Sequence, residues 1–174
     1  MHIVFMGVSG SGKSTVALSV AQRLGLPYAE ADGFHPEANI AKMSAGTPLT
    51  DEDRRPWLRS LAAWISDHEL RGESTLMACS ALKRSYRDTL RSGAPGVYFV
   101  HLDAPTAVIA ERLRARAGHF MPAGLLDSQQ ATLEPLEDDE AGITIDVSDS
   151  AAQVAGRVLD AVTAALGLSA PPQA

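Results

Sequence analysis

The stretch GVSGSGKS, at residues 7–14, has the glycine spacing and the terminal Lys-Ser pair of a phosphate-binding loop. An apolar run precedes it and a helical pattern follows it, which is the context that this motif requires. Gly7, Gly10 and Gly12 allow the backbone to curl so that successive N–H groups point inward at phosphate oxygens. The helix that follows directs the positive end of its dipole at the same place. The stretch therefore predicts the binding of a purine nucleoside triphosphate.

Two side chains of this loop carry chemistry beyond anion binding. Lys13 is placed to reach the β- and γ-phosphates, and the Ser14 hydroxyl is suited to ligate Mg²⁺. ATP and Mg²⁺ are the expected cofactors, because the phosphates supply further oxygen ligands to the metal. The alternative is a glycine-rich turn without a ligand, which requires both the pattern and its placement to be accidental. The residues expected to bind ATP are Gly7, Val8, Ser9, Gly10, Ser11, Gly12, Lys13, Ser14, Thr15 and Arg112.

Phosphoryl transfer to a small acceptor also needs an acid that orients a hydroxyl group. Asp32 ends the strand expected at residues 28–31, and ligands collect at the carboxyl ends of strands in an open parallel sheet. Asp32 is therefore the candidate for this catalytic role. The alternative is a helix cap before Pro36.

Mobile cations are needed to neutralise the transferred phosphoryl group, together with a cover against water. Arg112 and Arg116 share one face of the helix expected at residues 106–116, because they are four residues apart. They open the irregular segment 117–134, so its closure could carry them over the phosphates as catalytic groups. The alternative is a solvated helix face.

The elements that must position these residues alternate between apolar runs of strand length and helical patterns. Five strands separated by helices predict an α/β fold, with a five-stranded, mostly parallel sheet covered by helices on both faces in the three-layer arrangement of P-loop NTPases. The helix at 84–91 is expected to be a charged surface helix. The expected strands are 2–6, 28–31, 74–80, 97–102 and 142–148, and the expected helices are 14–24, 36–44, one that starts after Thr50, 84–91, 106–116 and 151–166.

The segment 117–140 fits neither pattern, since it has mixed periodicity, two glycines, two prolines and an acidic end. Irregular stretches of this length inside a compact domain are usually functional. We expect a mobile lid at about 117–134. The remaining organisation is simple: a single domain over residues 1–168 and a flexible tail at 169–174.

The composition of the chain limits the kinds of partner and the cellular compartment that we expect. The chain has 174 residues, and fifteen basic against twenty-one acidic residues give a net charge of −6, which argues against nucleic acid and anionic membranes as partners. Cys79 is the only cysteine and lies in an apolar run, so we expect a buried packing residue rather than a nucleophile. No signal peptide or membrane-spanning run is visible, which favours the cytoplasm.

Three further stretches, together with the phosphate-binding loop, carry a resemblance to a known family. They are HPEANIAKMSAGTPLTDEDRRPWL, CSALKRSYRDTLR and RARAGHFMPAGLLDSQQATLEPLEDDE. Over about residues 3–148 the chain resembles gluconokinase of the small P-loop type, which is distantly similar to shikimate kinase and nucleoside monophosphate kinases. The resemblance implies ATP-dependent phosphorylation of D-gluconate at its terminal hydroxyl to 6-phospho-D-gluconate. It also implies a homodimer, a substrate-binding helical region at about 35–70 and a lid.

A gluconate-like acceptor carries one carboxylate and a row of hydroxyls, so its pocket needs cations together with hydrogen-bonding groups. We expect Asp32 to orient or accept the proton of the attacking hydroxyl. Arg54 is the first candidate for the carboxylate, because a guanidinium group can grip it with two hydrogen bonds. The residues expected to bind the acceptor are Asp32, His35, Asn39, Lys42, Arg54 and Lys83.

Some of these residues have equally good structural explanations. His35 and Asn39 could support the fold instead of contacting hydroxyls, and Arg84 and Arg87 are expected on a solvated helix. Two departures from the family's usual residues also matter. Glu30 stands where the family commonly has aspartate, which bears on a water-mediated contact to Mg²⁺, and Gln130 stands where an aromatic residue is frequent, which would loosen the packing of the lid.

Two other functions remain open at this stage. One is a kinase for a different small acceptor, such as shikimate or a nucleoside monophosphate. The other is a nucleotide-binding regulator that hydrolyses ATP slowly to switch partners. The acids and cations that follow the phosphate loop argue against the regulator, because a switch needs no such pocket.

Overall fold

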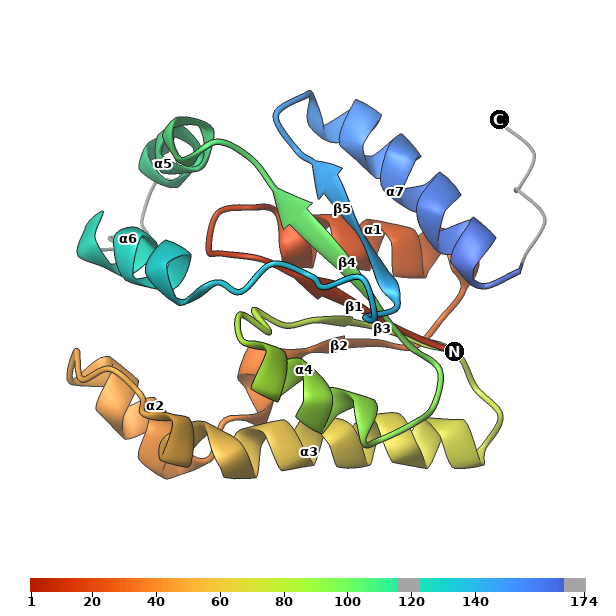
Figure 1. Ribbon diagram of the computed structural model, residues 1–174, viewed down its shortest axis with the longest axis horizontal. Coiled ribbons are helices and arrows are strands. Elements are labelled where there is room, and N and C mark those ends of the chain that lie inside the picture. The colour runs from red at the N-terminus through yellow and green to blue at the C-terminus, as the bar shows by residue number, and fades with distance from the viewer. Residues whose placement is uncertain (116–122, 168–174) are drawn as a thin grey trace.

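The apolar runs expected to be strands form one sheet in a computed structural model that describes residues 1–115 and 123–167 (Figure 1). The five strands lie in the order β2-β3-β1-β4-β5, and every neighbouring pair is parallel. The predicted parallel sheet is confirmed. The strands are β1 (His2–Met6), β2 (Tyr28–Glu30), β3 (Thr75–Ala78), β4 (Val97–Asp103) and β5 (Gly142–Asp146).

Six helices lie where the sequence predicts them, but residues 123–132, within the segment expected to be irregular, also form a helix. Helix α3 begins directly after Thr50 with a capping arrangement, in which the Thr50 hydroxyl accepts a hydrogen bond from the backbone N–H of Asp53. No helix of the described residues is long and apolar enough to cross a membrane. The helices are α1 (Lys13–Leu24), the short 3₁₀ helix η1 (Ala31–Phe34), α2 (Glu37–Ser44), α3 (Asp51–Leu70), α4 (Arg84–Arg91), α5 (Thr106–Ala115), α6 (Ala123–Thr132) and α7 (Ala151–Ala165).

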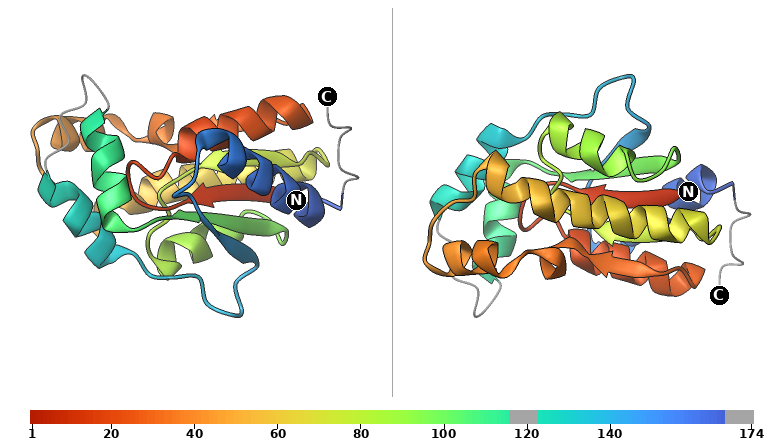
Figure 2. Two further views of the ribbon diagram at one scale, coloured as in Figure 1. Left: turned by 90° about the horizontal axis from the view of Figure 1, so that it is seen from above. Right: turned by 90° about the horizontal axis from the view of Figure 1, so that it is seen from below.

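The alternation of side chains along β1 explains the three layers, because successive residues of a strand point to opposite faces. Ile3 and Phe5 belong to a core shared with α1 and α7. Val4 and Met6 belong to a second core shared with α3 and α4. Figures 1 and 2 show the sheet between these two helical layers, with α5 and α6 together at one end. The predicted cover on both faces is confirmed.

The second core contains one apolar face of α3. Trp57, Leu61 and Ile65 are buried, and Trp64 packs edge-on against Phe34 with ring centroids 6.4 Å apart. Both tryptophans therefore belong to this core.

The single cysteine lies in the same core, directly after β3. The Cys79 side chain is buried, and burial raises the pKa of its thiol to about 12. The thiol stays protonated at neutral pH, so Cys79 is a packing residue, as expected.

Helix α4 departs from the prediction at one position. Arg87 was expected on a solvated face, but its side chain is completely buried. Its Nε and Nη2 groups donate hydrogen bonds of 2.7 Å to the two carboxylate oxygens of Glu140, which is also buried. The prediction is wrong because a local charge pattern gives no sign of a partner 53 residues further along the chain. Arg87 also donates to the backbone carbonyls of Ala81, Leu82, Glu134 and Pro135.

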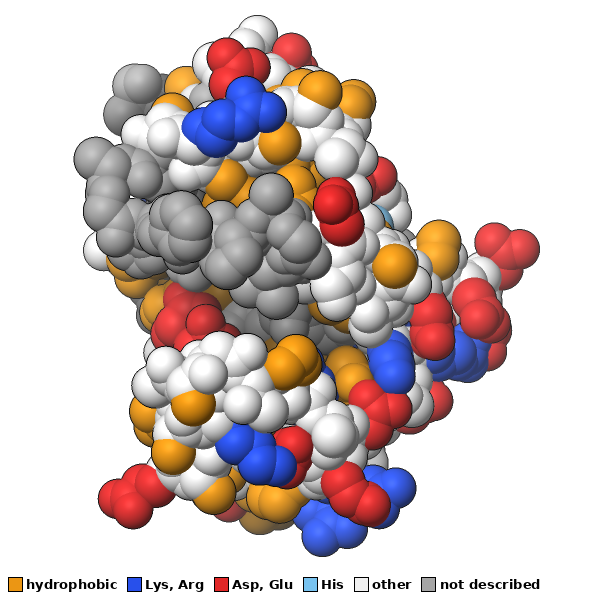
Figure 3. Space-filling view, turned by 90° about the vertical axis from the view of Figure 1, so that its left-hand side faces the viewer, with side chains coloured by type: hydrophobic (Ala, Val, Ile, Leu, Met, Phe, Trp, Pro, Cys, Tyr) orange, Lys and Arg blue, Asp and Glu red, His pale blue; other side chains and the backbone are white. Residues whose placement is uncertain are grey.

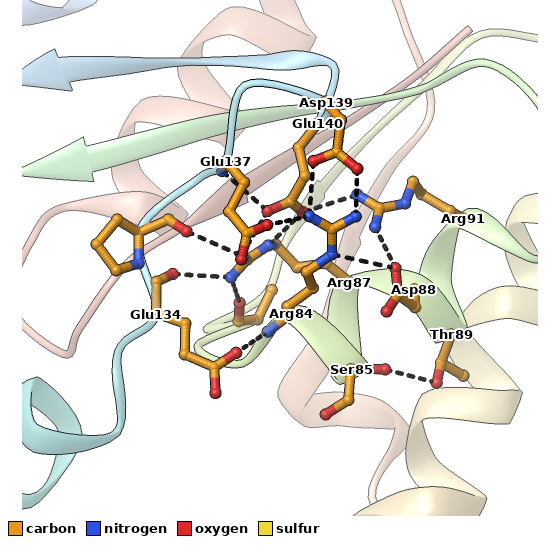
Figure 4. A network of polar contacts seen from close by, with 12 residues as sticks. Arg84, Ser85, Arg87, Asp88, Thr89, Arg91, Glu134, Glu137, Asp139 and Glu140 are labelled. Carbon is orange, nitrogen blue, oxygen red and sulfur yellow. Dashed lines mark hydrogen bonds and ion pairs between the residues drawn. The ribbon is translucent and has the colours of Figure 1, made fainter.

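Other arginines of α4 bind the same acidic segment (Figure 4). Arg84 pairs with Glu137 and Asp139 at 2.6 Å, and Arg91 donates to Glu140 at 2.7 Å. The acidic end of the irregular stretch therefore packs along α4, and its charges are matched there by arginines.

The pKa of Glu140 reflects these contacts. Burial by itself raises the pKa of this carboxyl, but hydrogen bonds from Arg87 and Arg91 outweigh burial and lower the pKa to about 2. A carboxyl with a lower pKa in the folded chain stabilises the fold above its unfolded pKa of about 4.3. That contribution is lost as the pH falls from about 5 toward 2.

Replacing Glu140 with glutamine should leave the Arg87 guanidinium buried without a counter-charge. We expect Glu140→Gln to lower the free energy of unfolding at neutral pH by about 3 kcal/mol, measured by urea unfolding. The decline of stability between about pH 5 and pH 2 should also become shallower, because one depressed carboxyl is removed.

The matched control is Asp139→Asn, which removes one charge from the exposed pair with Arg84. It should change stability little. Equal losses in the two variants would contradict the importance of burial for the Arg87–Glu140 pair.

Candidate active site

The turn between β1 and α1 has the geometry that its glycines predict. The φ angles of Gly7, Gly10 and Gly12 are 134°, 86° and 93°, values that side chains disfavour. A Cβ atom on Gly7 would lie 2.6 Å from the Leu102 carbonyl oxygen, and one on Gly10 would lie 2.8 Å from the Cγ atom of Leu113. The turn is therefore packed closely against the end of β4 and against α5.

Two groups of this turn are bonded to other parts of the chain. The Lys13 ammonium donates to the Val8 carbonyl at 2.9 Å, which folds the lysine back over the turn. The backbone N–H of Ser9 donates to the Oε1 atom of Gln129 on α6, at 2.7 Å. Both contacts involve groups expected to bind phosphate.

Strand β2 brings an acid toward the start of α1. The Tyr28 hydroxyl donates to Glu30 at 2.7 Å. Burial, and then this hydrogen bond to Glu30, raises the pKa of Tyr28, while an interaction with the Ser14 side chain opposes the rise. Ser14, Tyr28 and Glu30 thus form one group of oxygens beside the phosphate turn.

Asp32 lies in η1, directly after β2, with an exposed side chain. Burial is the main cause of the raised pKa of Cys79, but Asp32 adds to the rise and Lys13 opposes it. Burial is also the main cause of the lowered pKa of His35, and there Asp32 opposes the fall while Arg54 adds to it. Asp32 follows β2 and therefore lies at the same edge of the parallel sheet as the phosphate turn.

His35 and Asn39 both have structural partners. The His35 ring stacks on Trp57 with centroids 4.4 Å apart and an interplanar angle of 14°, and its lowered pKa keeps it neutral at pH 7. Asn39 is buried, donates to the Asp53 carbonyl at 2.8 Å, and lies 3.3 Å from the His35 Nδ1 atom. These bonds join α2 to α3. Contacts of either residue with an acceptor's hydroxyls stay predictions.

Two of the three cations expected to bind a carboxylate already have acidic partners. Lys42 pairs with Asp53 at 2.6 Å, and Lys83 pairs with Asp51 at 2.8 Å. Figure 3 views the end of the molecule that carries α2 and the start of α3, and acidic and basic side chains lie side by side over its lower part. Both lysines are therefore largely neutralised from the first turn of α3.

Arg54 lies on the same helix as Asp51 and Asp53 and is held differently. One of its nitrogens lies 3.4 Å from the Leu49 carbonyl oxygen, and its guanidinium group lies 5.9 Å from the centre of the Tyr86 ring. Within the described part of the chain, Arg54 makes no ion pair with a carboxylate. Its planar group is thus the best placed of the three cations to bind an incoming carboxylate.

The side chain of Arg112, on α5, contacts the loop between β5 and α7. Its Nη2 group donates to the backbone carbonyls of Val147 and Asp149. These bonds attach the end of α5 to the loop around residues 148–151. The expected role of Arg112 in binding nucleotide stays a prediction, and Arg116 lies outside the described residues.

Two residues beside the site were not predicted. Tyr28 could have been found, because it lies two positions before Glu30 and so shares its face of the strand. Gln129 gives no such signal, since its contact with Ser9 joins residues 120 positions apart.

A glycine turn after a central parallel strand, with an acid at the end of another strand and a cation beyond it, defines a P-loop kinase. A family model described as an AAA domain matches residues 3–136, more than half of the chain, so the chain belongs to that family. Shikimate kinase from Aquifex aeolicus shares the fold: it is 18% identical, with a TM-score of 0.58, over 96% of this chain and 99% of that one.

Closer relatives give the particular family. Gluconokinase from Gluconobacter oxydans is 52% identical over 143 residues, 82% of this chain and 80% of the relative. The crystal structure of a sugar kinase from Janibacter sp. HTCC2649 is 55% identical with a TM-score of 0.87, over 97% of this chain and 98% of that one. A gluconokinase structure from Sinorhizobium meliloti 1021 is 44% identical with a TM-score of 0.83, over 95% of both chains. The chain belongs to the gluconokinase family, which confirms the resemblance in its sequence.

The close packing of the turn makes a test of nucleotide binding. We expect Gly10→Ala to weaken binding of ATP about tenfold or more. Alanine disfavours the positive φ angle of this position, and its methyl group would press against Leu113 of α5. Binding is measured by calorimetry with a non-hydrolysable ATP analogue and Mg²⁺.

Gly46→Ala is the matched control. Gly46 also has a positive φ, of 73°, but a Cβ atom there meets nothing within 4 Å. It should therefore leave nucleotide binding near the wild-type value. Equal weakening in both variants would show that general destabilisation, not the geometry of the turn, causes the loss.

Proposed function

We propose that this chain transfers the γ-phosphoryl group of ATP to the terminal hydroxyl of D-gluconate, producing 6-phospho-D-gluconate and ADP. The observation that carries the proposal is the position of Asp32. It lies directly after β2, at the edge of the parallel sheet where the turn after β1 presents Lys13, and its charge acts on His35 together with that of Arg54. The names and high identity of the gluconokinase relatives support the choice of acceptor.

This arrangement suits both ends of the acceptor. Arg54 binds the carboxylate with paired hydrogen bonds, which leaves the far hydroxyl to approach Asp32. The Asp32 carboxylate accepts the hydroxyl proton as the oxygen attacks the γ-phosphorus. The bond from that phosphorus to the β–γ bridging oxygen breaks, and ADP leaves with the electron pair. Lys13 stabilises the negative charge of the phosphoryl oxygens during transfer.

The oxygens beside the turn fit a magnesium ion. Among the described residues, no group of three or more His, Cys, Asp or Glu side chains could hold a metal ion by itself. Ser14 offers one hydroxyl, and Glu30 offers a carboxylate that can bind through water and is oriented by Tyr28. A hard cation with few protein ligands is what Mg²⁺ on ATP requires. When bound, Mg²⁺ neutralises charge on the β- and γ-phosphates.

The remaining features are part of the same proposal. The helical region at about 35–70 binds the acceptor, and the segment at about 117–134, which includes α6, acts as the lid. Arg112 and Arg116 serve the phosphates from the start of that lid. The enzyme works as a homodimer in the cytoplasm, without nucleic acid or membrane partners.

Replacing the proposed catalytic acid should separate turnover from nucleotide binding. We expect Asp32→Asn to lower kcat for gluconate about a hundredfold or more, because the amide cannot accept the proton. Affinity for ATP should stay near the wild-type value. Turnover is measured by ADP release, with the position of the phosphate identified in the product.

Glu37→Gln is the control, since Glu37 is an exposed acid at the start of the neighbouring α2. It should retain turnover. Normal turnover by Asp32→Asn would remove Asp32 from the mechanism.

The proposed carboxylate contact predicts a different kinetic change. We expect Arg54→Ala to raise the KM for gluconate about tenfold to a hundredfold, because charge-assisted hydrogen bonds are lost. The KM for ATP should change much less. Steady-state kinetics with each substrate varied in turn gives both values.

The neighbouring Arg55 provides a control on the same helix. It pairs with Glu52 and is well exposed, so Arg55→Ala should leave both KM values near wild type. If Arg54→Ala raised the KM for ATP as much as that for gluconate, the contact would not be specific to the acceptor.

A further inference from the structure

A hydrogen bond joins α6 to the phosphate turn. A backbone N–H of the turn, that of Ser9, donates to the side-chain oxygen of Gln129 at 2.7 Å. Within the described residues, it is the one hydrogen bond that joins α6 to the turn. A side chain thus occupies a donor that belongs to the segment expected to hold phosphate.

The chemistry of the two partners explains why this contact can be exchanged. A carboxamide oxygen and a phosphoryl oxygen are both acceptors for an N–H group, and one N–H makes a full-strength hydrogen bond to one acceptor at a time. An amide carries no net charge, so it satisfies the N–H without adding negative charge where a triphosphate must bind. A carboxylate in the same position would repel that triphosphate.

The surroundings of α6 show what else holds it. The neighbouring Gln130 forms hydrogen bonds of 3.0 and 2.8 Å with Thr106, at the start of α5. Beyond the helix, the backbone N–H of Glu134 donates to the Leu82 carbonyl at 2.8 Å. Neither contact involves the turn. Gln129 is therefore the point at which occupation of the turn can change how α6 is held.

We propose that Gln129 is a positioning residue of the phosphate site, which holds the Ser9 N–H while no phosphate is bound and yields it to a phosphoryl oxygen of the nucleotide. The exchange couples α6 to the occupation of the turn. It rests on the nucleotide-binding part of the proposed function and is independent of the identity of the acceptor.

An internal acceptor that must be displaced lowers the apparent affinity for the nucleotide. Removing a hydrogen bond of ordinary net strength from the unbound state should therefore tighten nucleotide binding about fivefold. A merely structural glutamine predicts the opposite, since loss of its support would loosen the turn and weaken binding.

The experiment measures the dissociation constant of a non-hydrolysable ATP analogue by calorimetry, with Mg²⁺ and without any acceptor. We expect Gln129→Ala to bind the analogue about fivefold more tightly than the wild type. Gln129→Glu should bind it more weakly than the wild type, because the carboxylate holds Ser9 more strongly and repels the phosphates. Unchanged or weaker binding by Gln129→Ala would overturn the proposal.

Gln130→Ala is the matched control, since it removes the same kind of side chain from the next position of α6 while leaving the turn untouched. It should bind the analogue like the wild type. Tightening as large as that of Gln129→Ala would assign the effect to α6 in general and overturn a specific exchange at Ser9.

Hydrogen exchange at the Ser9 amide gives a second measurement that does not depend on affinity. Without nucleotide, exchange should be slower in the wild type than in Gln129→Ala, and with the analogue bound the two should agree. Equal exchange without nucleotide would overturn the proposal. Because no acceptor is present, these failures differ from a failure to phosphorylate gluconate, which is measured separately by turnover.

Discussion

The position of the phosphate turn is fixed by the strands on either side of β1, and the rest of the site is arranged around it. The Gly7 N–H donates to the Ser80 carbonyl at 3.2 Å, just after β3, and the Leu102 carbonyl of β4 leaves no room for a side chain on Gly7. Because all five strands are parallel, each delivers the residues that follow it to the same edge of the sheet. Asp32, which follows β2, lies at the same edge as the turn for that reason.

Charge at this edge is controlled locally, since the whole chain carries a net charge of −6 and yet is proposed to bind two anions. Asp51 and Asp53, in the first turn of α3, pair with the nearby lysines. In the proposed function, attraction for a carboxylate is thereby concentrated on Arg54, whose planar group lies over Tyr86. Recognition then depends on the direction of a few N–H groups more than on a broad positive field.

Local patterns predicted those parts of the molecule that depend on neighbours in sequence. Apolar runs of strand length located the strands, helical spacing located every helix of the described residues except η1 and α6, and the loop motif located the phosphate turn. What the sequence could not reveal are pairs joined only by the fold. Arg87 looked like a surface residue because Glu140 lies 53 positions away, and Gln129 carried no sign of its bond to Ser9. The bond between Tyr28 and Glu30 was easier to predict, since both residues lie on the same strand.

The buried Arg87 connects the segment after β3 with the segment after α6. It donates to the carbonyl of Ala81, whose φ of 42° is unusual for a residue with a side chain, and Ala81 follows the Ser80 carbonyl that holds the turn. Its ion pair with Glu140 fixes the segment that follows α6. Desolvation offsets much of the attraction between two buried charges, so an apolar pair could stabilise the fold as well. An apolar pair could not donate several N–H groups to backbone carbonyls at once. The arginine therefore holds the backbone beside the phosphate turn and the backbone that follows α6 in fixed positions.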